Sequence, residues 1–86
     1  MAPLRIMYFA WLRERTGRAS EDIPVPDGVH TVGDLMAWLR ARDAGHQAAF
    51  INPRLVRAAV NQVFAGPDTA LSPGDEVAFF PPVTGG

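Results

Sequence analysis

The sequence contains no cysteine and no lysine among its 86 residues. Without cysteine, the chain has no disulfide bond, no thiolate nucleophile and no cysteine-based metal site. Without lysine, it has no side-chain amine for Schiff-base chemistry, and no lysine that could accept an isopeptide bond. All eight basic residues are therefore arginines.

A strong charge of one sign and a long apolar run are also missing. The net charge is −1, so neither a basic nucleic-acid footprint nor an acidic tail is present. No apolar run approaches the roughly 20 residues that span a membrane. Arg5, Arg13 and Glu14 interrupt the apolar N-terminal stretch, which does not resemble a signal peptide. We expect a cytoplasmic protein without nucleic-acid or membrane partners.

The apolar segments and turn signals predict one α+β domain with a mixed sheet. In the first half of the chain we expect a strand at 4–10, a short helical turn at 11–17, an edge strand at 21–28 and a main helix at 30–43. A connection at 44–53, with room for another short turn of helix, follows. We then expect a strand with a tight turn and a short edge segment at 55–65, and a last strand at 76–80. From this order of elements we expect the helix to cross the sheet and the last strand to return beside the first, and these two strands are also the most apolar.

The main helix has clear local signals. Thr31 occupies an N-cap position, and Asp34 stands where the acid of a capping box belongs. The spacing i, i+3, i+4, i+7 predicts one apolar stripe that faces the sheet, formed by Val32, Leu35, Met36 and Leu39.

Conventional catalytic groupings are absent from the sequence. His30 and His46 are the only histidines, and we place one beside a helix cap and the other in a loop. Neither has a second histidine or a cysteine at ligand spacing, so both are interpreted as structural or solvent-exposed residues. Asp75 and Glu76 are adjacent in a strand and point to opposite faces, and Asp75 is expected to serve the preceding turn.

The last eight residues, "FFPPVTGG" (79–86), give the strongest functional signal. Pro81 and Pro82 end the last strand and stiffen the start of an arm, because proline cannot donate a ladder hydrogen bond. Gly85 and Gly86 have no side chains, so a narrow channel can close around the bare backbone. We therefore expect a domain at 1–80 and an extended tail at 81–86 with a reach of about 20 Å.

The carboxylate of Gly86 is the candidate reactive group. ATP can convert a carboxylate to an acyl adenylate, and a sulfur donor that displaces AMP then leaves a thiocarboxylate. We expect Gly85 to give access to the tip, while Pro81, Pro82, Val83 and Thr84 contact a partner.

Aromatic residues are candidates for the docking surface. Phe79 and Phe80 point to opposite faces, so one is expected to pack toward the helix and the other to face outward. Together with Phe9 or Phe64, the outward ring forms a candidate apolar docking patch, although core packing is the favoured interpretation of Phe9.

Three segments resemble one known family over essentially the whole chain. "SPGDEVAFFPPVTGG" (72–86) is similar to the C-terminus of the small subunit of molybdopterin synthase, the MoaD family. "MYFAWLRERTG" (7–17) resembles that family's strand-to-helix segment, and "AAVNQ" (58–62) its middle strand and turn.

The resemblance implies a ubiquitin-like β-grasp fold with the first and last strands parallel in the middle of the sheet. It also implies that a ubiquitin-activating-like enzyme (MoeB family) uses ATP to adenylate Gly86, and that a sulfurtransferase or cysteine desulfurase system supplies the sulfur. The tail would then enter the large synthase subunit (MoaE family) and donate sulfur to cyclic pyranopterin monophosphate within a heterotetramer. The chain would be an enzyme only as this sulfur-donating subunit, with no resident cofactor or metal.

Three alternatives stay open at this point. The chain could carry sulfur for another pathway, such as thiamine synthesis or tRNA thiolation. It could be a ubiquitin-like modifier that is joined to target lysines through Gly86. It could also be an interaction domain with an inert tail.

Overall fold

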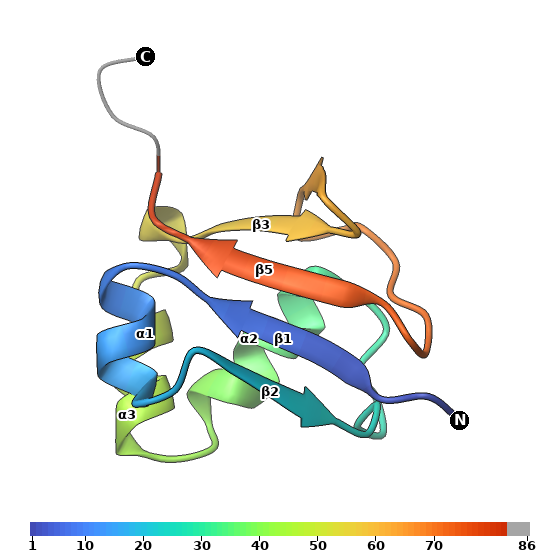
Figure 1. Cartoon of the computed structure of the whole chain (residues 1–86), viewed down its shortest axis with the longest axis horizontal. Helices are drawn as coiled ribbons and strands as arrows, with labels where there is room; N and C mark the ends of the chain where they lie inside the picture. Colours follow the sequence, from blue (N-terminus) through green and yellow to red (C-terminus); the bar gives the residue numbers. More distant parts are fainter. Residues whose placement is uncertain (83–86) are drawn as a thin grey trace.

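Five strands form one mixed sheet in the computed structural model, which describes residues 1–82 (Figure 1). The strands are β1 (Leu4–Tyr8), β2 (Ser20–Ile23), β3 (Arg57–Val60), β4 (Val63–Ala65) and β5 (Glu76–Phe80). Their order across the sheet is β2-β1-β5-β3-β4. The central pair β1–β5 is parallel, and the other pairs are antiparallel. The predicted α+β fold, with the first and last strands side by side, is confirmed.

The helices are α1 (Trp11–Thr16), α2 (Val32–Arg40), α3 (Ala44–Phe50) and a 3₁₀ turn, η1 (Pro53–Leu55). In Figure 1, α2 lies behind the sheet. Gly17 ends α1 with a φ of 79°, in the left-handed region that glycine adopts readily. The edge strand β2 is shorter than expected and ends at Ile23, before the first of the two prolines that follow it.

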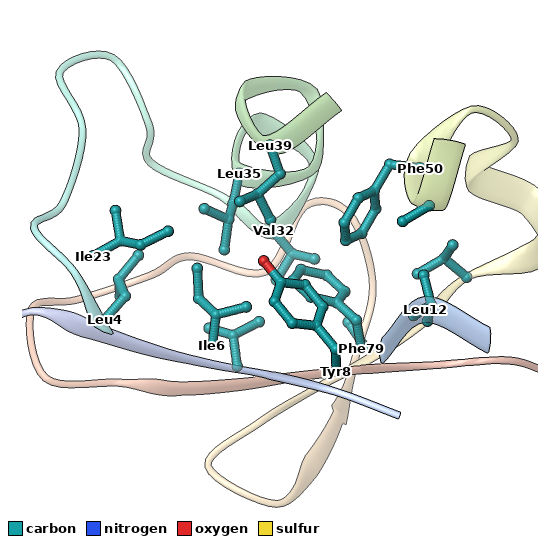
Figure 2. Packing of buried hydrophobic residues seen from close by; sticks show 14 of the residues in the cluster. Leu4, Ile6, Tyr8, Leu12, Ile23, Val32, Leu35, Leu39, Phe50 and Phe79 are labelled. Atoms are coloured by element: carbon teal, nitrogen blue, oxygen red, sulfur yellow. The ribbon is translucent and has the colours of Figure 1, made fainter. Parts of the chain in front are cut away.

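The inner face of the sheet carries the core. Leu4, Ile6 and Tyr8 alternate along β1 toward the helices, and Val77 and Phe79 do the same along β5. All five side chains are almost completely buried (Figure 2). Tyr8 of β1, Phe79 of β5 and Phe50 of α3 form an aromatic cluster, which holds the end of β5 against this helix.

The capping box of α2 is confirmed. The amide of Asp34 donates to Thr31 Oγ1 at 3.1 Å, and the amide of Thr31 donates to Asp34 Oδ2 at 3.2 Å. Such a cap contributes about 1 kcal/mol. The helix is shorter than predicted at both ends, and of its apolar stripe only Met36 remains partly exposed.

The segment at 44–53 differs most from its prediction. It contains α3, which is capped by Asp43 through a 2.9 Å hydrogen bond from the amide of His46, and then η1. The placement of His46 in a loop is wrong, because this residue lies inside α3 and is fully buried. The helix depends on contacts with segments distant in sequence.

The β3–β4 hairpin has the tight turn that the sequence predicts. Asn61 and Gln62 have φ values of 51° and 69°, as a two-residue hairpin turn requires. Asn61 also ties the hairpin to β5, because its Nδ2 donates to Asp75 Oδ1 and its Oδ1 accepts from the amide of Glu76. The turn role of Asp75 is confirmed by a 2.8 Å hydrogen bond from the amide of Ser72.

Candidate functional site

The last described residues form the base of the C-terminal arm. β5 lies between β1 and β3, so hydrogen bonds on both sides fix its direction up to Phe80. Pro81 and Pro82 follow and are half-buried. The predicted roles of Val83, Thr84, Gly85 and Gly86 concern residues outside the described ones and remain predictions, as does the division of the chain after residue 80.

The two phenylalanines at the end of β5 have opposite environments. Phe79 has no exposed surface, and its ring lies 5.0 Å from that of Phe50, edge to face. A docking role for Phe79 is therefore wrong, because alternation along the strand turns it into the core. Phe80 is half-buried on the other face, with its ring centroid 5.9 Å from that of Phe64.

The outer face of the sheet carries an apolar patch beside the arm base. Strand registers place Met7 opposite Ala78, Ala78 opposite Ala59 and Ala59 opposite Phe64. We call this row together with Phe80 the outer-face patch. Phe64 is 79% exposed, and the patch points away from the buried side of each strand. A contiguous exposed apolar surface of this kind is typical of protein docking sites.

Phe9 is exposed, contrary to the favoured interpretation of core packing. Its side chain is 44% exposed, because β1 ends at Tyr8 and Ala10, with a φ of 55°, turns the chain into α1. The amide of Phe9 still donates to the carbonyl of Phe79 at 3.1 Å. This bond places Phe9 level with Phe80, one strand away.

A hollow of about 390 Å³ lies beside the arm base. Its lining includes the rings of Phe64 and Phe80, together with Pro82 and the side chain of Arg57. Arg57 stands directly opposite Phe80 in the β3–β5 register. Sequence reasoning missed Arg57, because only the pairing of two distant strands brings it to the arm.

The outer face becomes charged farther from the arm. Arg5 pairs with Asp22 at 3.1 Å and stands opposite Glu76 in the register. These side chains are exposed, so the ion pair contributes about 0–1 kcal/mol. The apolar and charged rows divide this face into two zones, and the arm emerges from the apolar one.

A polar cluster lies on the helix side of the sheet, with Glu21 at its centre. Tyr8 Oη donates to Glu21 Oε2 at 2.7 Å, His46 Nε2 lies 2.9 Å from the same oxygen, and Arg42 Nη1 lies 2.6 Å from Oε1. His46 Nδ1 also lies 2.9 Å from Asp43 Oδ1. The cluster joins β1, β2, α3 and the loop before α3.

The electrostatics of this cluster indicate a structural role. Burial alone raises the pKa of Glu21, but hydrogen bonds from Tyr8, His46 and Arg42 outweigh it and lower that pKa to about 2. Burial and the hydrogen bond to Glu21 raise the pKa of Tyr8 above its ordinary value. The Glu21 side chain is only 8% exposed and His46 is fully enclosed, so a substrate has no access to either.

Among residues 1–82, no three histidine, aspartate or glutamate side chains are grouped closely enough to hold a metal ion. Within the same described range, no helix has the length and apolar character needed to cross a membrane. The candidate functional site is the arm base with the outer-face patch and the hollow beside it.

A mixed sheet with a parallel central pair and a helix across one face defines a ubiquitin-like β-grasp domain. Residues 6–86 match the ThiS family, and the chain belongs to this family.

Individual relatives are similar over nearly the full length. The molybdopterin synthase sulfur carrier subunit of Escherichia coli is 37% identical, and the match covers 96% of this chain and 99% of that protein. Small archaeal modifier protein 3 of Haloferax volcanii is 36% identical, over 96% of this chain and 98% of that protein. The structure described as a putative molybdopterin converting factor, subunit 1, from Pyrococcus furiosus superposes with a TM-score of 0.77 at 30% identity, over 96% of this chain and all of that one.

Proposed function

We propose that this chain is the sulfur-carrying small subunit of molybdopterin synthase. The observation that carries the proposal is the sequence after β5, in which Pro81 and Pro82 are followed within a few residues by the pair Gly85-Gly86. The full-length similarity to a molybdopterin synthase sulfur carrier subunit supports it.

The chemistry of the proposal takes place at the carboxylate of Gly86. A ubiquitin-activating-like enzyme lets this carboxylate attack the α-phosphorus of ATP, which forms an acyl adenylate and releases pyrophosphate. The terminal sulfur of a persulfide on a sulfurtransferase or cysteine desulfurase then attacks the carbonyl carbon and expels AMP, and a second thiol reduces the resulting acyl disulfide and is itself oxidised to a disulfide. The product is a thiocarboxylate, which donates its sulfur to cyclic pyranopterin monophosphate and is returned to a carboxylate by water.

The described part of the chain contributes positioning rather than acid–base catalysis. β5 and the two prolines direct the arm, and the outer-face patch docks the large synthase subunit, which supplies the groups that bind the pterin. ATP is consumed by the activating enzyme and is not held by this chain. The proposed location of this cycle is the cytoplasm.

The decisive experiment is intact mass spectrometry of the chain after incubation with the activating enzyme, ATP and a sulfur source. Replacement of one oxygen by sulfur adds about 16 Da. Deletion of Gly86 leaves the folded domain unchanged and serves as the matched control, which should gain no mass. Absence of the shift in wild-type protein, under conditions that thiolate a known carrier, would refute the proposal.

A second candidate function is that of a protein modifier joined through Gly86 to lysines of target proteins. It is favoured by the 36% identity to small archaeal modifier protein 3. The chain has no lysine, so it cannot form lysine-linked chains on itself. Covalent conjugates of tagged wild-type protein, absent after deletion of Gly86, would support this function.

A further inference from the structure

A second hollow lies on the other side of Arg57, between α2 and the β3–β4 hairpin. It has a volume of about 360 Å³ and is mainly apolar, and it shares Arg57, Ala58 and Ala65 with the hollow at the arm base. Its floor includes Val32, which is buried, and Met36, which is half-buried. The two hollows therefore adjoin at these three shared lining residues.

The walls of this second hollow are fixed by backbone hydrogen bonds. The amide of Gly33 in α2 donates to the carbonyl of Pro67 at 2.9 Å, and the amide of Val32 donates to the carbonyl of Thr69 at 3.0 Å. A Cβ atom at Gly33 would lie 3.1 Å from the Pro67 oxygen, so this close approach suits glycine. A ligand would meet a formed surface, which lowers the ordering cost of binding.

Two arginines mark the rim. Arg54 and Arg57 both line the hollow and are exposed. Arg57 Nη1 donates to the carbonyl of Arg54 at 2.9 Å, which holds the guanidinium in place. Neither arginine forms an ion pair within residues 1–82, whereas Arg5, Arg18 and Arg42 do. An apolar floor with a fixed guanidinium at its rim complements an apolar segment that carries carboxylates.

We propose that the hollow between α2 and the β3–β4 hairpin binds an acidic segment of the large synthase subunit, with an apolar side chain on Met36 and carboxylates on Arg54 and Arg57. This inference rests on the proposed function. Because the two hollows share Arg57, Ala58 and Ala65, one partner that docks beside Phe80 and Pro82 can also reach this second hollow.

The test is the affinity of the full chain for the purified large subunit of the same organism, measured by calorimetry at low and high salt. The double variant R54E/R57E should weaken binding by about tenfold or more at low salt, and by less at high salt, because charge complementarity is screened. R57K should retain part of the affinity. M36E, which adds a like charge on the floor, should also weaken binding, and thermal melting verifies that it folds.

R13E is the charge control, because Arg13 is exposed on α1, away from the hollow, and its reversal changes the net charge by −2, half of the −4 change in R54E/R57E. It should change the affinity by less than about twofold. Equal weakening by R13E, or unchanged binding by R54E/R57E, would overturn the inference while wild-type binding still supports the proposed function. R54E/R57E could also bind the large subunit normally but fail to form the thiocarboxylate. That result would overturn the inference as well, since the acidic partner would then be the activating enzyme. Failure of wild-type thiolation would instead remove the proposed function itself.

Discussion

The two faces of β5 serve different purposes within a single strand. Phe79 packs against Tyr8 and Phe50 with no exposed surface, while Phe80, one residue later, lies half-buried against Phe64 on the outer face. The inner face is covered by helices and holds the fold together. The outer face presents apolar side chains that contribute little to the core. The alternation of one strand thus separates the side chains that stabilise the core from those that we propose for partner recognition.

The largest effect is expected from Phe79→Ala. Removing a fully buried ring leaves a cavity among Tyr8, Phe50 and the inner strand residues, which costs about 3–5 kcal/mol of unfolding free energy. Urea denaturation followed by circular dichroism would measure the loss. A loss below about 1 kcal/mol would mean that the inner face is not the source of stability.

The neighbouring change Phe80→Ala is expected to have the opposite profile. It should weaken binding to the large synthase subunit by about tenfold or more, because docking energy concentrates in a few aromatic residues. Unfolding free energy should fall by only about 1 kcal/mol, from the loss of the Phe64 contact. Calorimetric affinity and urea denaturation on the same sample would compare both quantities. Unchanged affinity would remove Phe80 from the docking surface.

Tyr8→Phe tests the polar cluster of the inner face. Loss of the 2.7 Å hydrogen bond to Glu21 should cost about 1 kcal/mol near neutral pH. The pKa of Glu21 is lowered from its ordinary 4.5 to about 2 in the folded chain, so its stabilisation is present above pH 4.5 and is lost as the pH falls toward 2. Tyr8→Phe removes one of the hydrogen bonds that lower the pKa of Glu21, so this pKa should be higher in the folded variant than in the folded wild type.

The difference between wild type and Tyr8→Phe should therefore stay constant above about pH 4.5 and shrink as the pH falls from there toward about 2, in urea denaturation at each pH. A difference that is constant with pH would show that Tyr8 acts through packing alone. The outer-face variant Phe80→Ala is the control, since it touches no member of the cluster.

The smallest effect is expected from Gln62→Gly, which lies in the hairpin turn. Gln62 has a φ of 69°, and glycine adopts this region without strain, so the variant should gain about 0.5 kcal/mol. Asn61→Gly, at a similar φ, should instead lose stability because it removes the bonds to Asp75 and Glu76. Thermal melting would rank the two variants, and a gain from both would contradict the role of the Asn61 side chain.

Features set by local sequence were predictable. The capping box of Thr31 and Asp34, the left-handed end of α1 at Gly17 and the turn at Asn61 all follow from neighbouring residues. The parallel pairing of β1 with β5 was implied by the family resemblance, and the apolar character of both segments is consistent with their central place in the sheet.

Features set by distant partners were not predictable. The burial of His46 depends on Glu21, 25 residues earlier, and no local pattern announces that contact. The exposure of Phe9 depends on the turn at Ala10, where a non-glycine residue adopts a positive φ. The alternation of side chains along a strand predicts that Phe79 and Phe80 point to opposite faces. Which of the two faces inward depends on the helices that pack on one side of the sheet.

The parallel pairing of β1 and β5 also determines how the domain responds to mechanical force. The N-terminal end of β1 and the C-terminal end of β5 lie at opposite ends of the pair (Figure 1). Tension between the N-terminus and the end of β5 therefore shears the pair, and its hydrogen bonds share the load instead of opening one after another. The domain is therefore expected to resist a pull that is applied at the end of β5.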